Sequence, residues 1–244
     1  MKEIEADYFL SYFEMLEDRI IEFQKIIPFC RKHKNVHSPI LTGIINESCN
    51  LLDSLFYTYY SHSGKTTSQP NIKDYKKFYN SPLLLHKTKT VLFVTPPQYC
   101  MPFKEWSKKN ISPKWWAINN KLKHEMVGHI NNGTYISAIH ALCALHQSIV
   151  KIVQYGYDPT LGKIILRHNW IKSDMDHGFL VHLLDQSSSW NGKVCIVETK
   201  LFATPMGDTD LGGMMHRDFP DDISELSPDI FNAPHSRLSY FLGR

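Results

Sequence analysis

The stretch that decides the fold of this chain is Ser112-Pro113-Lys114-Trp115-Trp116-Ala117-Ile118-Asn119-Asn120-Lys121-Leu122-Lys123-His124. Ser112 is a good helix N-cap and Pro113 suits the first helical position, so we expect a helix to begin here. The pattern predicts that this helix continues to about His129. There Asn131-Asn132-Gly133 should end it, with the glycine in a left-handed turn.

One edge of this helix carries an unusual set of side chains. Trp116, Asn120 and His124 recur every four residues, and Lys123 lies beside His124. Buried polar groups need hydrogen-bond partners, so such a set is costly to bury by chance. Two interpretations stay open: a functional polar edge, or a helix whose tryptophans pack in the core while Asn120, Lys123 and His124 face water.

The composition is that of one large globular domain, or of one domain with a sizeable extension. The chain has 244 residues, of which 43% are hydrophobic and 21% charged, and a core of this size needs no metal or disulfide. The formal net charge of +3 permits nucleic-acid binding without arguing for it, because a dedicated binder shows a denser basic patch.

The expected location is the cytoplasm. The five cysteines are widely spaced and form no CxxC pair, so we expect reduced thiols. The charged N-terminus lacks the apolar core of a signal peptide. No run approaches the roughly 20 apolar residues of a membrane span, so we expect no membrane association.

Helices are expected over most of the first 155 residues. Apolar residues at spacings of three and four predict a helix over residues 3–27. Ser38-Pro39 should begin a second one that runs to about Tyr60, antiparallel to the first. A short helix over 71–79 and a long one from Thr134 to about Tyr155 complete the set.

Strand signals occur mainly after Gly156. We expect strands at 164–166, 179–184 and 193–197, with a turn joining the last two, and irregular chain over 206–234. An earlier extended run spans 88–95, and prolines should keep the chain after it irregular until Phe103 and Trp106 anchor it onto the bundle. The predicted organisation is a helical domain over 1–155 and a β-containing extension over 156–244.

Two familiar motifs fail on spacing. Gly64-Lys65-Thr66 mimics the end of a phosphate loop, but Tyr59 stands where that motif needs a glycine. His124-Glu125 with His129 suggests a zinc protease, yet the histidines are five residues apart, about 500° of helical rotation, and so do not share a face. We expect no metal at this helix.

Two acidic groups in the C-terminal part were weighed as metal sites. Asp185 and Glu198 end neighbouring predicted strands, and with Lys200 they would suit a metal-dependent nuclease, but Glu-x-Lys is a common triplet and a surface hairpin with a charged rim explains them better. Asp174, Asp176 and His177 are interpreted as a turn rather than a metal site.

The order of these elements resembles the HEPN superfamily of helical-bundle proteins over residues 3–155. The resemblance rests on two long helices, on the irregular stretch with Pro102-Phe103 and Trp106, and on the motif Ser112-Pro113-x-Trp115-Trp116-x-x-Asn119-Asn120-x-x-Lys123-His124 before a second core helix. It implies a mainly α fold, an antiparallel HEPN-like helical bundle.

The resemblance also implies an activity. Many HEPN proteins are metal-independent endoribonucleases of toxin–antitoxin and phage-defence systems, and their active pattern is an arginine, a polar residue, three further residues and a histidine. Here Asn120 and His124 keep their places, while Asn119 stands where the arginine would be. His124 would transfer protons as the RNA 2′-hydroxyl attacks the neighbouring phosphate, and Lys123 or Lys121 would stabilise the developing charge.

Further expectations follow from the same resemblance. It implies a homodimer that needs no cofactor and binds RNA, with an antitoxin or defence-system protein as partner. Trp116 on the same helix is a candidate RNA contact, as are Arg31 and Lys32 of the basic loop at 31–37, which is otherwise a solvated turn. The alternative is a catalytically degenerate HEPN-like module that binds a partner protein or a nucleotide, and the asparagine at 119 favours it.

Overall fold

A computed structural model gives the fold of the chain. It describes residues 3–62, 69–153, 155–158, 163–166, 180–184, 194–207, 219 and 221–225. Within these residues the protein is mainly helical with a small antiparallel sheet, as the sequence predicts at this level. The predicted segments at 64–66, 174–177, 185 and 187–192 lie outside the described residues.

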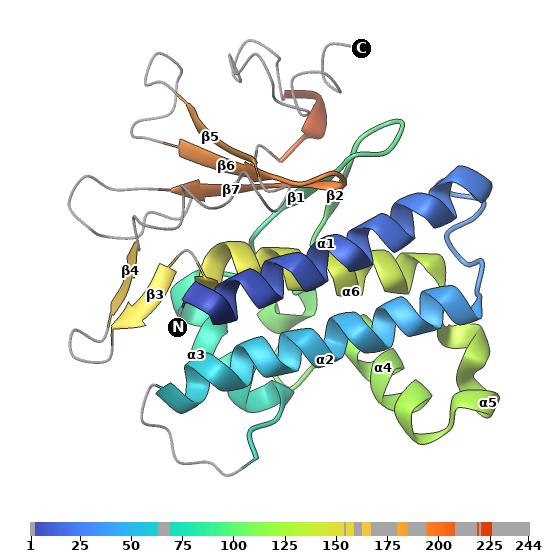
Figure 1. The fold of residues 1–244 in the computed structure, drawn as a ribbon, viewed down its shortest axis with the longest axis horizontal. Helices are drawn as coiled ribbons and strands as arrows, with labels where there is room; N and C mark the ends of the chain where they lie inside the picture. The colour runs from blue at the N-terminus through green and yellow to red at the C-terminus, as the bar shows by residue number, and fades with distance from the viewer. Residues whose placement is uncertain are drawn as a thin grey trace.

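Four helices form the bundle. Helix α1 (Glu3–Ile26) runs antiparallel to α2 (Pro39–His62), as predicted, and α6 (Tyr135–Ser148) packs against both, while α4 (Lys114–His124) packs against α2 and α6 (Figure 1). The apolar stripe of α1 is fully buried at Phe13, Leu16 and Ile20. The bundle therefore follows from the apolar periodicity of its helices.

Side-chain caps set several helix starts. The Ser38 hydroxyl accepts a hydrogen bond from the Leu41 amide (3.2 Å), as expected for the start of α2. Thr134 caps α6 in the same way, and Asn71 with Asp74 forms a capping box at α3 (Ile72–Leu83). Helix α3 extends four residues beyond the predicted end, and Leu84 then ends it in a left-handed conformation.

The helix from residue 113 is shorter than predicted. Helix α4 ends at His124 because Glu125 leaves the helical region (φ −150°, ψ 73°), and the single turn α5 (Met126–His129) follows. Gly133 has φ −71°, so the expected left-handed turn is wrong. The glycine is needed for another reason: a Cβ there would lie 2.2 Å from the Thr42 hydroxyl.

A five-stranded antiparallel sheet lies beside α1 and α6, in the order β2-β1-β7-β6-β5 (Figure 1). Its strands are β1 (Thr90–Leu92), β2 (Gln98–Cys100), β5 (Leu180–Leu184), β6 (Val194–Glu198) and β7 (Phe202–Gly207). A separate hairpin pairs β3 (Tyr155–Asp158) with β4 (Lys163–Leu166).

The sequence missed part of this sheet. It predicted the β5–β6 pair and β1, but not β7 and not β2, which lies in the proline-rich segment expected to be irregular; in the separate hairpin it predicted β4 but not β3. Helix α6 also stops before residue 155, because the chain widens into a π-helical turn at Ile149–Val153. The sheet combines strands from 90–100 and from 180–207, so both predicted ranges contribute to it.

The sheet packs on the helices through aromatic and polar contacts. Phe202 of β7 contacts the rings of Phe13 and His146. On α6, Gln147 donates hydrogen bonds to the Thr88 carbonyl (3.1 Å) and the Thr90 hydroxyl (2.8 Å), all of them buried. Burial lowers the pKa of the His146 imidazole to about 3, so this imidazole is neutral in the folded protein.

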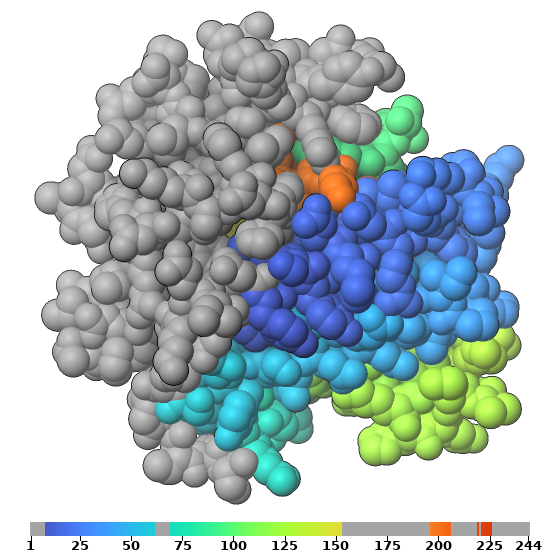
Figure 2. Space-filling model, viewed as in Figure 1, coloured from blue at the N-terminus to red at the C-terminus, as the bar shows by residue number. Residues whose placement is uncertain are grey.

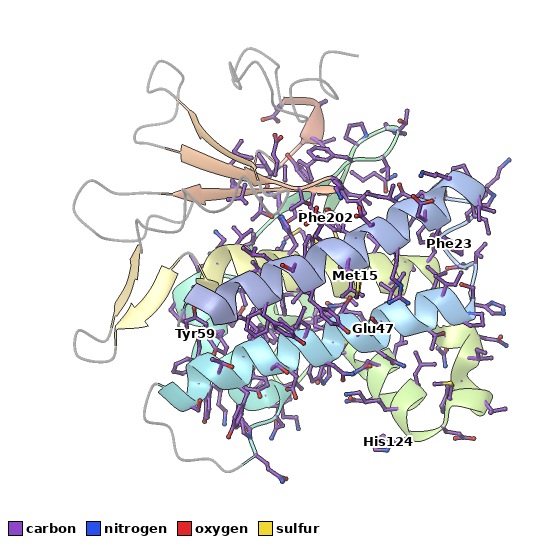
Figure 3. The ribbon with its side chains drawn as sticks, in the orientation of Figure 1. Met15, Phe23, Glu47, Tyr59, His124 and Phe202 are labelled. Carbon is purple, nitrogen blue, oxygen red and sulfur yellow. The ribbon has the colours of Figure 1, made fainter. Side chains whose placement is uncertain are left out.

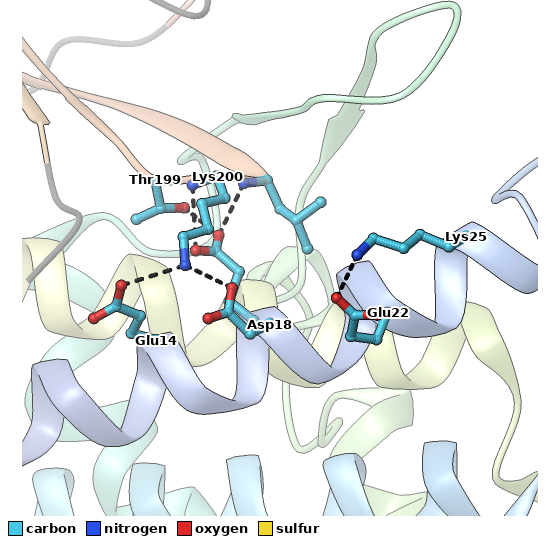
Figure 4. A network of polar contacts seen from close by, with 8 residues as sticks. Glu14, Asp18, Glu22, Lys25, Thr199 and Lys200 are labelled. Carbon is cyan, nitrogen blue, oxygen red and sulfur yellow. Dashed lines mark hydrogen bonds and ion pairs between the residues drawn. The ribbon is translucent and has the colours of Figure 1, made fainter.

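A buried carboxyl group joins the turn between β6 and β7 to α1. Glu17 is 2% exposed and accepts hydrogen bonds from the Thr199 hydroxyl, the Lys200 amide (3.2 Å) and the Leu201 amide (2.9 Å) (Figure 4). Beside it the Lys200 ammonium pairs with Asp18 (2.6 Å) and Glu14 (3.3 Å). The Glu17 carboxyl group thus accepts three hydrogen bonds from the turn between β6 and β7.

Glu17 should make the stability depend on pH. Burial raises its pKa from 4.5 to about 7, against the opposing hydrogen bonds and the Lys200 charge. A raised carboxyl pKa means that the folded state binds more protons than the unfolded state between these values, so the free energy of unfolding falls as pH rises from 4.5 through 7. Urea denaturation should show a fall of about 3 kcal/mol over this range that Glu17→Gln lacks.

Glu22→Gln is the matched control, because it removes one exposed carboxylate of the same helix. Parallel pH profiles for wild type and Glu17→Gln would contradict the assignment.

Candidate functional site

The inner face of α4 holds this helix in the core. Trp115, Trp116, Asn119 and Leu122 are buried, and the Trp115 indole donates a hydrogen bond to the Pro102 carbonyl (2.8 Å). Pro113 occupies the N-cap position and no side chain caps the helix, so the expected capping by Ser112 is wrong. Packing of the tryptophans therefore fixes where α4 lies.

The outer face of α4 presents polar side chains to solvent. Asn120, Lys121, Lys123 and His124 are all exposed, and His124 lies at the outer edge of the molecule (Figure 3). None of these four side chains forms a hydrogen bond or an ion pair with another residue that the structure describes. The polar edge is thus not buried, and its groups are available for contact with a ligand.

Asn119 lies apart from this edge. Its side chain is fully buried, and neither its amide nitrogen nor its amide oxygen has a hydrogen-bond partner among the described residues. It is the residue that stands at the arginine position of the HEPN pattern. A buried, uncharged amide cannot replace the arginine as a cation at a phosphate group in solvent, so Lys121 or Lys123 would have to supply that charge at this edge.

The charge of Lys123 affects the pKa values of two side chains of helix α2. Asp53 of α2 has a raised carboxyl pKa because neighbouring groups desolvate it, while the Tyr75 hydroxyl and the Lys123 charge oppose this shift. Lys123 also acts on the buried Cys49 thiol, whose pKa desolvation raises. Lys123 therefore stands between the exposed edge and α2, with Asp53 as a partial counter-charge.

The other residues predicted to contact RNA differ in their exposure to solvent. Trp116 is 9% exposed and its ring makes a T-shaped contact with Trp115, so little of its surface reaches solvent. Arg31 and Lys32 are exposed in the connection between α1 and α2. This connection bonds to the start of α6, since the Tyr135 amide donates to the Val36 carbonyl (2.8 Å). It lies at the same end of the bundle as α5 (Figure 1).

Two residues of the metal-nuclease hypothesis, Glu198 and Lys200, have structural positions in the fold. Lys200 is held by Glu14 and Asp18 of α1, Glu198 is fully buried, and Asp185 lies outside the described residues. Across the described part of the chain, no group of three or more His, Cys, Asp or Glu residues is arranged to hold a metal ion.

A buried cysteine cluster escaped the sequence analysis. Cys100 of β2 contacts Cys143 and His140 of α6, although the two cysteines are 43 positions apart in the sequence. Burial would raise the pKa of the Cys100 thiol, but hydrogen bonds with Cys143 and His140 and the imidazole charge hold it below its usual value. Cys100 is 3% exposed, so we assign the cluster no catalytic role. Cys30, Cys49, Cys100 and Cys143 are free thiols, as expected.

Comparison with protein-family models, with curated proteins and with solved structures finds no match to this chain. The resemblance to HEPN proteins therefore stays a prediction from the sequence pattern. No helix that the structure describes is both long enough and apolar enough to cross a membrane.

Replacing Asn119 by leucine should stabilise the protein. The substitution removes a buried amide that has no partner in the described structure, so the free energy of unfolding should rise by about 1–2 kcal/mol. Asn120→Leu, on the exposed face of the same helix, is the matched control, since it gains the same helix propensity without changing the core. Urea denaturation of both variants measures the difference. A less stable Asn119→Leu would mean that the amide has a partner that the structure does not describe.

Proposed function

We propose that this protein is a metal-independent endoribonuclease of the HEPN type that acts in a cytoplasmic toxin–antitoxin or phage-defence setting. The observation that supports this most is the exposed edge of α4, where Asn120, Lys123 and His124 lie within five residues and keep the family spacing. Residues four apart on a helix are neighbours, so Asn120 and His124 can contact the same phosphodiester.

The chemistry assigns one role to each group. The His124 imidazole takes the proton from the RNA 2′-hydroxyl or gives one to the departing 5′-oxygen, because an imidazole exchanges protons near neutral pH. Lys123, with Lys121 beside it, stabilises the negative charge that develops on the phosphate. Asn120 donates a hydrogen bond from its amide to a phosphate oxygen and so orients the group.

A homodimer would strengthen this site. Two copies of α4 facing each other would place four lysines and two histidines around one RNA strand, and one imidazole could act as base while the other acts as acid. Figure 2 shows that the segment of α4 and α5 stands out at one corner of the molecule, where a second copy could approach it.

A second candidate is a catalytically silent HEPN-like module that binds a partner protein or a nucleotide. The burial of Asn119 favours it, since the non-titrating cation of the family pattern has no equivalent at this position. The counter-charge of Asp53 near Lys123 points the same way. We place it second because Lys121 and Lys123 still supply positive charge at the edge.

His124→Ala should abolish RNA cleavage and leave the fold intact. Purified protein is incubated with structured RNA in the presence of a chelator, and the loss of a group that transfers protons should reduce the cleavage rate at least about 100-fold. Because His124 is exposed and forms no described contact, the melting temperature should not change.

His129→Ala is the matched control, because His129 lies five residues away and pairs with Glu125 (3.6 Å). It should cleave at the wild-type rate. Equal rates for wild type and His124→Ala, or intact RNA with micromolar wild-type protein, would favour the binding module.

A further inference from the structure

A lysine-lined cleft lies between α3 and the segment at 106–112. Its volume is about 490 Å³, within the range of ligand sites. Five of its lining residues are lysines, and no aspartate or glutamate lines it: Lys73, Lys76, Lys77, Lys108 and Lys109. We call this the lysine cleft. No sequence motif marks it.

The positive charge of this region is concentrated. Residues 72–114 contain nine lysines and only two acidic residues, Asp74 and Glu105, whereas the whole chain carries a formal charge of +3. The Asp74 carboxylate accepts a hydrogen bond from the Asn71 amide in the capping box of α3 (3.0 Å) and keeps its negative charge. Nine lysines and two carboxylates still give the segment a formal charge of +7.

The lysines of α3 repel one another. Lys73, Lys76 and Lys77 lie three and four residues apart and so share one face of the helix, where like charges destabilise it. Lys76 reaches across the lysine cleft and donates a hydrogen bond to the Lys108 carbonyl, which ties the two walls together. Lys73 and Lys77 are exposed, and no ion pair joins either of them to a residue that the structure describes. An anion bound between the walls would relieve this repulsion.

The walls suit a phosphate chain better than a single small anion. Polar groups of Asn80, Ser107 and Asn110 line the lysine cleft together with the lysines, and Ile111, which is 43% exposed, adds an apolar surface. Amide and hydroxyl groups contact phosphate oxygens and sugars, and an exposed aliphatic side chain can contact a base. A row of cations with such neighbours matches the repeating charge of a nucleic-acid strand.

The lysine cleft is also connected to the proposed catalytic edge. Ser112, which lines it, leads directly into α4, and the rise of 1.5 Å per residue places His124 about 15 Å from the first residue of that helix. The positive end of the helix dipole lies on the side of the lysine cleft. A strand of a few nucleotides can span such a distance.

We propose that the lysine cleft binds the phosphate backbone of a single RNA strand. That this strand is the substrate cleaved at His124 rests on the proposed function, whereas binding itself depends only on the charges of the cleft. Lys73 and Lys77 each contact a phosphate, and both contacts release counterions.

Fluorescence anisotropy with a labelled single-stranded RNA tests the proposal. The dissociation constant is measured at several salt concentrations for wild type and for Lys73→Ala/Lys77→Ala. For single strands each lost phosphate contact makes the negative slope of log affinity against log salt less steep by about 0.7, so the double variant should reduce its steepness by about 1.4 and weaken binding at low salt at least about tenfold. The melting temperature of the variant should stay the same or rise, because two repelling charges are removed.

Lys25→Ala removes the charge of an exposed lysine of α1, outside the lysine cleft and outside residues 72–114, and should bind RNA with the wild-type slope. An unchanged affinity and slope in Lys73→Ala/Lys77→Ala would overturn the proposal, and so would a wild-type protein that binds ATP but not RNA. The His124→Ala variant separates this proposal from the proposed function. It should bind RNA with the wild-type slope whether or not the wild type cleaves.

Discussion

The carboxyl group of Glu17 holds together parts of the chain that are more than 180 residues apart. It is buried in α1 and accepts three hydrogen bonds from the turn between β6 and β7. Burying such a group costs desolvation free energy, which its hydrogen bonds offset. Without these hydrogen bonds the buried carboxyl group would destabilise the fold. The turn is thereby fixed on α1, which positions Phe202 against Phe13 and places β7 where β1 can pair with it. The position of the sheet on the helices depends on this contact.

The helices could be predicted from the sequence because their information is local. The apolar stripe of α1 and the caps at Ser38 and Thr134 lie within a few residues of the elements they define. The sheet could not be predicted to the same extent, because β1 pairs with β7 across about 110 residues and β2 is only three residues long. The Glu17 contact is equally distant in sequence, and nothing near Glu17 in the chain marks it as buried. The predicted end of α4 was wrong because the break was expected at Asn131-Asn132-Gly133, whereas the backbone already leaves the helical region at Glu125.

The candidate site also has features that local sequence predicts and features that depend on the fold. Periodicity placed Asn120 and His124 together on one edge of α4, and the structure leaves both exposed. The burial of Asn119 depends on how α4 packs against α2 and α6, which the sequence of one helix does not contain. The lysine cleft was missed for a related reason. A net charge of +3 averages over the whole chain and conceals a segment in which nine lysines face two acidic residues, and only the fold brings α3 next to residues 106–112. The sequence thus indicated the residues proposed for catalysis, Asn120 and His124, but not the lysine cleft proposed to bind RNA.

The proposed function requires that the 2′-hydroxyl of RNA be the attacking group, with the imidazole and the cations of the exposed edge of α4 beside the phosphate. Mass spectrometry of the RNA ends left by the purified wild-type protein, with a chelator present throughout, tests this most directly. We predict fragments that carry a 2′,3′-cyclic phosphate on one side of the cut and a 5′-hydroxyl on the other. Fragments with a 5′-phosphate and a 3′-hydroxyl, or RNA that stays intact, would contradict the account.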